Sequence, residues 1–193
     1  MAESLNITGN TSRQRYESFV PQLCALLSGE GNRMGVLANA AAALRQAFHF
    51  FWVGFYLTEG FLCDKGWLVE PTVRQPVSPS AVPFGEGALP GDRLLLGPFQ
   101  GDIACFSIHK GHGVCGAAWA EERTIVVPDV EAFPGHIACS SLSRSEIVVP
   151  LFDASHNIVG VLDVDSDKLN DFSPDDKWGL EQCAAIVAEA LVG

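Results

Sequence analysis

The sequence predicts an α+β domain in which helices flank a mainly antiparallel sheet. Two stretches with helical periodicity open the chain, a series of short β-prone runs follows, and one helical stretch closes it. This order of helices, several strands and a final helix is typical of helices grouped around one antiparallel sheet. Hydrophobic residues make up 48% of the 193 residues, which is enough for the core of one domain.

The first two helices are predicted from their apolar periodicity and their ends. Between Arg15 and about Ser28, large apolar residues recur every three or four positions, which predicts a helix with one buried stripe. Pro21 within it indicates either a kink or a later start. Asn32 is a suitable N-cap for a second helix that runs to about Phe48. The polar residues before this pair, 1–12, are expected to be loose.

The predicted sheet begins with an aromatic strand from Phe50 to Leu57. Gly54 within it indicates a bulge or a close approach to the backbone. A turn at 58–60 is expected to lead into a second strand from Phe61 to Val69. Five further strands are expected, at 94–96, 104–109, 125–127, 146–152 and 158–165.

Two more helices and one insertion complete the predicted domain. Residues 114–121 form a short helix, and Ser173 with Pro174 marks the start of a final helix that ends near Leu191. Five prolines lie between residues 70 and 91, together with Ser and Gly. Such a stretch is typical of an irregular surface loop, longer than compact domains usually contain, so we interpret it as an insertion.

Composition and charge exclude several classes of partner. The net charge of −11 argues against nucleic acid and anionic membrane surfaces, since both require clusters of Lys and Arg. No apolar run approaches the ~20 residues of a membrane span, and the N-terminus lacks the basic and apolar regions of a secretion signal. Six cysteines spread over a chain of this size favour a reduced, cytoplasmic setting over a disulfide framework.

The cysteines differ in their surroundings. Cys24 and Cys183 lie on apolar helical faces and are interpreted as inert buried thiols, whereas Cys63 could be inert or functional. Cys139 lies in a predicted loop near His136 and several serines. A loop thiol close to backbone N–H groups and basic side chains is favoured to ionise.

Two further thiols could act together with Cys139. Cys105 and Cys115 both lie in Gly- or Ala-rich segments. A nucleophilic thiol that becomes oxidised needs a resolving thiol, which either residue could provide.

Three carboxylates are expected on one hairpin. Asp163 and Asp165 are two positions apart on a strand and therefore point to the same face. A four-residue loop at 153–156 would place Glu146 opposite Asp163 and all three acids on one face. A five-residue loop would instead turn Glu146 to the other face.

A shared patch of three acids would raise the pKa of at least one carboxyl and provide a proton donor at neutral pH. The alternative is a solvated hairpin face. A divalent metal site would also use carboxylates, although no metal-binding loop of the EF-hand type is present.

Several motifs in chain order closely resemble the free methionine-(R)-sulfoxide reductases, a family of small proteins made of a single GAF domain. They are WVGFY at 52–56, GPFQG at 97–101, AC at 104–105, GHGVCG at 111–116, FPGHIAC at 133–139, SRSEIVVPL at 143–151 and GVLDVDS at 160–166. The resemblance covers nearly the whole chain apart from residues 1–12 and 70–91. It implies a GAF domain at 13–193 that contains the Pro-rich insertion.

The resemblance implies a thiol mechanism without a cofactor or metal. Cys139 would attack the sulfur of free methionine-(R)-sulfoxide and become a sulfenic acid. Cys105 would condense with it to a disulfide that thioredoxin reduces, and Cys115 would be a second or alternative relay thiol. The family commonly forms homodimers, so a homodimer is expected here as well.

The resemblance also implies the substrate contacts. Glu146, Asp163 and Asp165 match the family's acids, which donate a proton to the sulfoxide oxygen and hold the ammonium group. Trp52 and Tyr56 would surround the S-methyl group. Backbone N–H groups of Ile137, Ala138 and Cys139 would bind the carboxylate, and a methionine within a peptide has lost both charged groups.

Two features depart from the family pattern, Ser140 and the Pro-rich insertion at 70–91, and two other functions have to be weighed. Ser140 stands where the family usually has an acid directly after the catalytic Cys, which changes the electrostatics around Cys139. A GAF module that senses a small ligand, and a Cys105–Cys139 redox switch, are the alternatives to an enzyme. A redox switch does not need three clustered acids, which favours the enzyme over it.

Overall fold

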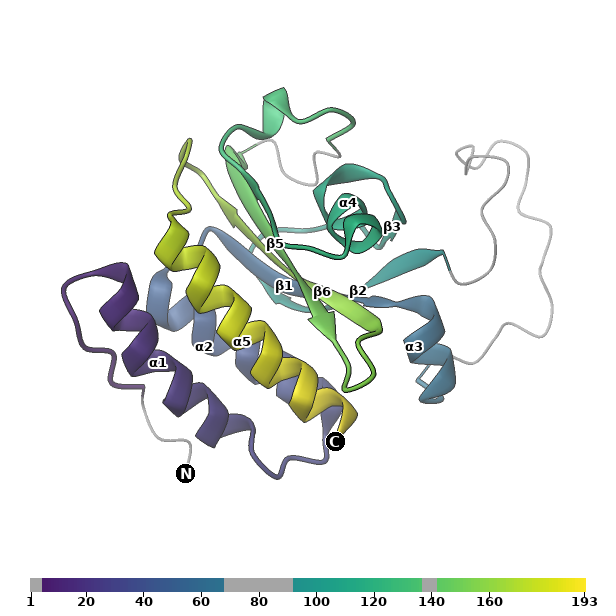
Figure 1. Cartoon of the computed structure of the whole chain (residues 1–193), viewed down its shortest axis with the longest axis horizontal. Helices are drawn as coiled ribbons and strands as arrows, with labels where there is room; N and C mark the ends of the chain where they lie inside the picture. Colours follow the sequence, from purple (N-terminus) through teal and green to yellow (C-terminus); the bar gives the residue numbers. More distant parts are fainter. Residues whose placement is uncertain (1–4, 68–91, 137–141) are drawn as a thin grey trace.

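One antiparallel sheet of six strands forms the centre of the computed structural model, which describes residues 5–67, 92–136 and 142–193 (Figure 1). The strands lie in the order β3-β2-β1-β6-β5-β4, and every neighbouring pair is antiparallel. Their bounds are β1 Trp52–Thr58, β2 Arg93–Gln100, β3 Ser107–His109, β4 Ile125–Val127, β5 Ser145–Phe152 and β6 Ile158–Ser166. The predicted α+β class with an antiparallel sheet is confirmed.

The helices divide between the two faces of this sheet. The long helices α1 (Ser12–Leu27), α2 (Arg33–Phe48) and α5 (Pro174–Val192) lie together on one face, which we call the helix face (Figure 1). The short helix α4 (Gly113–Glu121) packs against β5 and β6 on the opposite face, which we call the pocket face. A single-turn 3-10 helix, η1 (Val130–Ala132), follows β4.

The predicted caps explain where the long helices begin. The Asn32 side chain accepts a hydrogen bond from the Gly35 N–H, as predicted for the N-cap of α2. Ser173 and Asp176 form a reciprocal capping box at the start of α5, with Pro174 in the first turn. Helix α1 starts at Ser12 and continues through Pro21.

The described part of the N-terminal segment, expected to be loose, is hydrogen bonded to α1. The Asn6 N–H donates to Gln22 Oε1 over 2.9 Å, and the Gln22 amide donates back to the Asn6 carbonyl over 2.9 Å. The Thr8 N–H donates to Ser18 Oγ over 3.2 Å. Residues 6–8 therefore follow the surface of α1.

Two of the strand predictions are wrong in part. The segment after β1 forms a short helix, α3 (Glu59–Asp64), where a strand from Phe61 was predicted. Thr58 caps this helix by accepting from the Phe61 N–H, and Glu59 in the first turn suits the positive end of the helix dipole. Of the strand predicted at 104–109, only Ser107–His109 pairs with β2. The predicted insertion at 70–91 lies outside the described residues.

Alternation along the strands separates two cores. Leu162 and Val164 of β6 point to the helix face, where they join the apolar side chains of α1, α2 and α5. Val161 of the same strand lies on the pocket face with Trp52, Tyr56 and residues of α4. None of the helices in the described residues is long and apolar enough to cross a membrane.

Candidate active site

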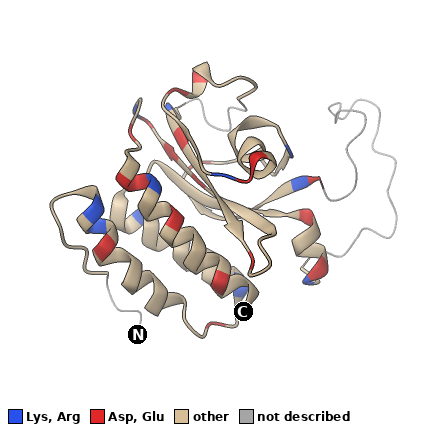
Figure 2. Cartoon of the chain, viewed as in Figure 1, with Lys and Arg blue, Asp and Glu red and all other residues tan. Residues whose placement is uncertain are grey.

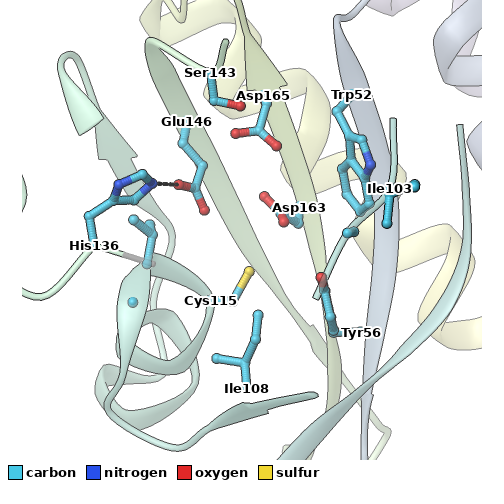
Figure 3. A pocket seen from close by; sticks show the side chains of 13 residues that line it. Trp52, Tyr56, Ile103, Ile108, Cys115, His136, Ser143, Glu146, Asp163 and Asp165 are labelled. Carbon is cyan, nitrogen blue, oxygen red and sulfur yellow. Dashed lines mark ion pairs between the residues drawn. The ribbon is translucent and has the colours of Figure 1, made fainter. Parts of the chain in front are cut away.

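A pocket of about 500 Å³, counted with its part open to solvent, lies on the pocket face of the sheet (Figure 3). Strands β1, β5 and β6 provide its floor, and α4 forms one side. The lining residues are Trp52, Tyr56, Ile103, Ala104, Ile108, Gly113, Val114, Cys115, His136, Ser143, Glu146, Asp163 and Asp165. Seven of the ten site residues predicted from the sequence are described, and all of these except Cys105 line this pocket.

The three acids share one face, although the hairpin differs from the prediction. Its loop has five residues, 153–157, and is closed by the pair Phe152–Ile158. A bulge at Val159 then restores the alternation, because Leu151 pairs with Gly160. Glu146 consequently lies opposite Asp165 rather than Asp163.

The acids are buried within the sheet rather than displayed on a solvated hairpin. Glu146 is 6% exposed and Asp163 is 7% exposed. In Figure 2, β5 and β6 carry acidic residues inside the sheet. The alternative of a solvated hairpin face is therefore wrong.

Burial and mutual repulsion keep protons on this cluster. Loss of hydration raises the pKa of Glu146 well above its usual value, and the neighbouring charges of Asp163 and Asp165 raise it further. Burial also raises the pKa of Asp163 well above its usual value, although hydrogen bonds from Cys115 and Glu146 lower it in part. Glu146 is thus the member best suited to hold a proton at neutral pH, with Asp163 as its acceptor.

Asp165 is the more accessible third acid. Burial raises its pKa to about 6, while a hydrogen bond from Ser143 partly opposes this shift. Ser143 is 8% exposed and precedes β5. No role for Ser143 was predicted from the sequence, because nothing in the local sequence shows that it faces Asp165.

His136 lies at the edge of the pocket beside Glu146 (Figure 3). Its Nε2 is 3.8 Å from Glu146 Oε2, and 16% of its side chain is exposed. Burial lowers the pKa of His136. The pKa shifts of His136 and Glu146 both favour the uncharged form of the side chain, so the contact is not a strong ion pair.

Two aromatic residues of β1 form the opposite side of the pocket. Trp52 Nε1–H donates to the Asp102 carbonyl over 3.0 Å, and the Tyr56 hydroxyl donates to the Cys105 carbonyl over 3.0 Å. These bonds attach the irregular segment 101–106 to the sheet. Cys105 is partly exposed there, between Ile103 and Phe106, which are 86% and 85% exposed.

Gly54 allows the aromatic side chains to pack closely over β1. The register between β1 and β2 shifts between Gly54 and Tyr56, which confirms the predicted bulge. A Cβ at Gly54 would lie 2.4 Å from both Phe99 Cβ and the Trp52 ring. Trp52 can therefore stack on Phe99, with ring centroids 5.3 Å apart, only because residue 54 has no side chain.

One donor set in the pocket has the composition of a metal site. Single ligand atoms of Cys115, Glu146 and Asp163 all lie within 4.8 Å of one another. The pKa of each of the three groups is raised, chiefly by burial, so a cation would have to displace protons in order to bind. In the absence of a cation, these groups form a protonated, hydrogen-bonded acid group.

Three predicted site residues, Ile137, Ala138 and Cys139, lie outside the described residues, as does Ser140. The described residues nearest to them in the pocket lining are His136 and Ser143.

The fold and this pocket define a GAF-domain protein. The family model for the GAF domain matches residues 36–192, so the chain belongs to the GAF domain family. The resemblance inferred from the motifs is confirmed by relatives and solved structures. The chain is 38% identical over 168 residues to the free methionine-R-sulfoxide reductase of Escherichia coli, with 86% of this chain and 82% of that protein covered.

Two further similarities extend over almost the entire chain. GAF domain-containing protein A of Dictyostelium discoideum is 48% identical over 187 residues, which cover 97% of this chain and 99% of that protein. The X-ray structure of the free methionine-R-sulfoxide reductase of Neisseria meningitidis in complex with its substrate superposes with a TM-score of 0.79. It is 39% identical, and 97% of this chain and 95% of that chain are covered.

Proposed function

We propose that this protein is an enzyme that reduces free L-methionine-(R)-S-oxide to L-methionine. The observation that supports this most is the buried group of Glu146, Asp163 and Asp165, which faces Trp52 and Tyr56 across one pocket. Carboxyls buried next to one another, without a neutralising positive charge, cost folding free energy, so such a cluster indicates a function. The similarity to reductases of this substrate from Escherichia coli and Neisseria meningitidis supports the same substrate here.

The proposed chemistry transfers two electrons from two thiols. The Cys139 thiolate attacks the sulfoxide sulfur and forms a sulfur–sulfur bond to it. The protonated oxygen then passes from the methionine sulfur to Cys139 as that bond breaks, so methionine leaves and Cys139 becomes a sulfenic acid. The Cys105 thiol then attacks the Cys139 sulfur, which forms a disulfide and releases water. Cys139 is three residues from His136 and four from Ser143, and both line the pocket, which supports a nucleophile at this position.

Glu146 is proposed as the proton donor to the sulfoxide oxygen. Oxygen leaves sulfur readily only when it is protonated, so the step needs an acid that still holds its proton near pH 7. The raised pKa of Glu146, caused by burial and by the charges of Asp163 and Asp165, satisfies this requirement. His136, 3.8 Å away and partly exposed, lies where it could return a proton from solvent.

Asp163 and Asp165 are proposed to bind the ammonium group of the substrate. Asp163 Oδ1 is buried and has no hydrogen-bond partner among the described residues. An ammonium group would supply both the missing donor and the compensating charge. The carboxylate would bind the backbone N–H groups of Ile137, Ala138 and Cys139. A methionine within a peptide lacks both charges, so only the free amino acid should be a good substrate.

Thioredoxin is proposed as the reductant of the Cys105–Cys139 disulfide in a reduced, cytoplasmic setting. Cys105 is partly exposed, and its neighbours Ile103 and Phe106 extend into solvent. An apolar surface around an accessible sulfur suits a protein dithiol that must approach closely for exchange. The homodimer expected from the family resemblance belongs to the same proposal.

The decisive experiment is a thioredoxin-coupled NADPH assay with four substrates. These are the R and S sulfoxides of free methionine, and the N-acetyl, C-amide derivative of each. We expect turnover of the free R form alone. The Cys139→Ser variant should release no methionine, whereas Cys105→Ser should release about one equivalent and then stop.

A sensing module is the alternative that this assay would reveal. Binding of free methionine sulfoxide by the wild-type protein without any release of methionine would refute the enzyme and favour a ligand sensor.

A further inference from the structure

Cys115 occupies a rigid position in the first turn of α4 and is 3% exposed. The turn is held against β3, because the Gly111 N–H donates to the Gly116 carbonyl over 2.8 Å. A Cβ at Gly116 would lie 2.3 Å from the His109 carbonyl oxygen, so this glycine is needed for the close packing. The thiol therefore has a defined direction, toward the acid cluster (Figure 3).

The thiol of Cys115 faces the carboxyl of Asp163, to which its S–H can donate a hydrogen bond. Its sulfur lies within 4.8 Å of a carboxyl oxygen of Asp163 and of Glu146. It is thus part of the same polar group that the proposed mechanism uses. Spacing and resemblance alone indicated a second or alternative relay role for Cys115.

The surroundings of Cys115 oppose the ionised form that a relay thiol needs. Burial raises its pKa well above the usual value, and the negative charges of Asp163, Glu146 and Asp165 raise it further. The N-terminus of α4 would favour a thiolate, but the desolvation and the three acids outweigh it. Cys115 therefore keeps its proton and remains a hydrogen-bond donor.

We infer that Cys115 is a positioning residue, whose S–H holds the Asp163 carboxyl with Oδ1 free for the substrate ammonium group, and that it carries no electrons to the disulfide. This inference rests on the proposed function and assigns Cys115 a role within the same site. The hydrogen bond also determines the charge of Asp163, since a donor to the carboxylate favours its ionised form.

Loss of this donor should be visible in a pH profile. Asp163 is faced by Cys115 from α4, by Glu146 from β5 and by Asp165 from its own strand, with His136 behind Glu146. The Cys115 hydrogen bond lowers the pKa of Asp163. Without it the carboxylate that binds ammonium forms only at higher pH, so the acid limb of kcat/KM should move upward in pH.

The test compares Cys115→Ser with Cys115→Ala. Serine cannot form a disulfide but can donate a hydrogen bond, whereas alanine can do neither. We expect Ser to keep steady-state turnover within a few-fold and to keep the wild-type pH profile. We expect Ala to raise KM about tenfold, the loss of one hydrogen bond to a charged group, and to shift the acid limb upward.

The same pair in a Cys139→Ser background measures binding without reaction. Affinity for free methionine-(R)-sulfoxide should fall about tenfold in the Ala variant relative to the Ser variant, with thermal unfolding recorded to show that both are folded. The inference is overturned if Ser and Ala lose steady-state turnover equally while both release one equivalent of methionine at the wild-type rate. It is equally overturned if both behave as wild type.

These outcomes separate the two proposals. Wild-type turnover of the free R sulfoxide tests the proposed function, and it would persist if Cys115 proved to be a relay. Absence of that turnover would count against the proposed function regardless of the Cys115 variants.

Discussion

The two faces of the same strand meet opposite requirements. On β6, Leu162 and Val164 are fully buried among the apolar side chains of α1, α2 and α5. Asp163, between them, is buried almost as deeply but points to the pocket face, where its partners are a glutamate and a thiol. Neighbouring positions thus differ in chemistry although they barely differ in burial.

This contrast shows which face stabilises the fold and which serves the site. Apolar burial on the helix face contributes about 25 cal/mol per Å² to folding. The acids on the pocket face oppose folding whenever they ionise, since burial disfavours the charged form. Substitutions on the helix face should therefore lower stability, whereas removal of a carboxyl on the pocket face should change activity without lowering stability.

The largest effect is expected from Glu146→Gln on the pocket face. The amide keeps the shape of the side chain but removes the proton that we assign to the sulfoxide oxygen. Methionine release in a single turnover should slow by about 10²- to 10⁴-fold, the usual contribution of a general acid. Thermal unfolding should show no loss of stability, because a carboxyl that opposes folding when ionised has been removed.

The exposed Glu131 in η1 provides a matched control. Glu131→Gln should release methionine at the wild-type rate. If Glu146→Gln slowed reduction of the disulfide by thioredoxin as much as it slowed methionine release, Glu146 would not be the acid of the first step.

The corresponding change on the helix face is Leu162→Ala. Leu162 is 0% exposed, so its truncation leaves a cavity and should lower the free energy of unfolding by about 2–5 kcal/mol. Chemical denaturation measures this loss, and Val126→Ala on the edge strand, where the side chain is 37% exposed, should cost less than about 1 kcal/mol. A large drop in kcat of the folded variant would show that the two faces are not independent.

Much of this contrast could be predicted from the sequence. The two-residue spacing of Asp163 and Asp165 placed both on one face, and the caps at Asn32 and Ser173 located two helix starts. Such features can be predicted because they depend only on residues that are close to one another in the sequence. Helix α3 was not predicted, although Thr58 and Glu59 form a suitable helix start, because the β-prone residues that follow favoured a strand.

The pairing within the site could not be derived in the same way. The partner of Glu146 depends on the loop length and on the bulge at Val159. The five-residue loop alone would turn Glu146 to the other face, and the bulge turns it back, so the two effects cancel. The approach of Cys115 to Asp163 depends on how α4 packs against β6, which cannot be predicted from the local sequence. Contacts between distant segments are thus the part that required the structure.

The effect of Asp165→Asn on stability should be smaller than that of Leu162→Ala and opposite in sign. Burial raises the pKa of Asp165 from 3.8 to about 6, so the folded protein holds this proton more tightly than the unfolded chain. The stabilisation from the protonated form is present below about pH 4 and is lost as the pH rises through 6. A shift of this size corresponds to about 3 kcal/mol.

Urea denaturation should therefore find Asp165→Asn more stable than wild type at pH 8, by up to that amount, and similar to it at pH 4. Asp167→Asn, on the exposed loop after β6, is the matched control. An equal gain in the free energy of unfolding at pH 4 and pH 8 would mean that desolvation of the Asp165 carboxylate is not its cause. The buried charges of the pocket face would then not oppose folding as argued above.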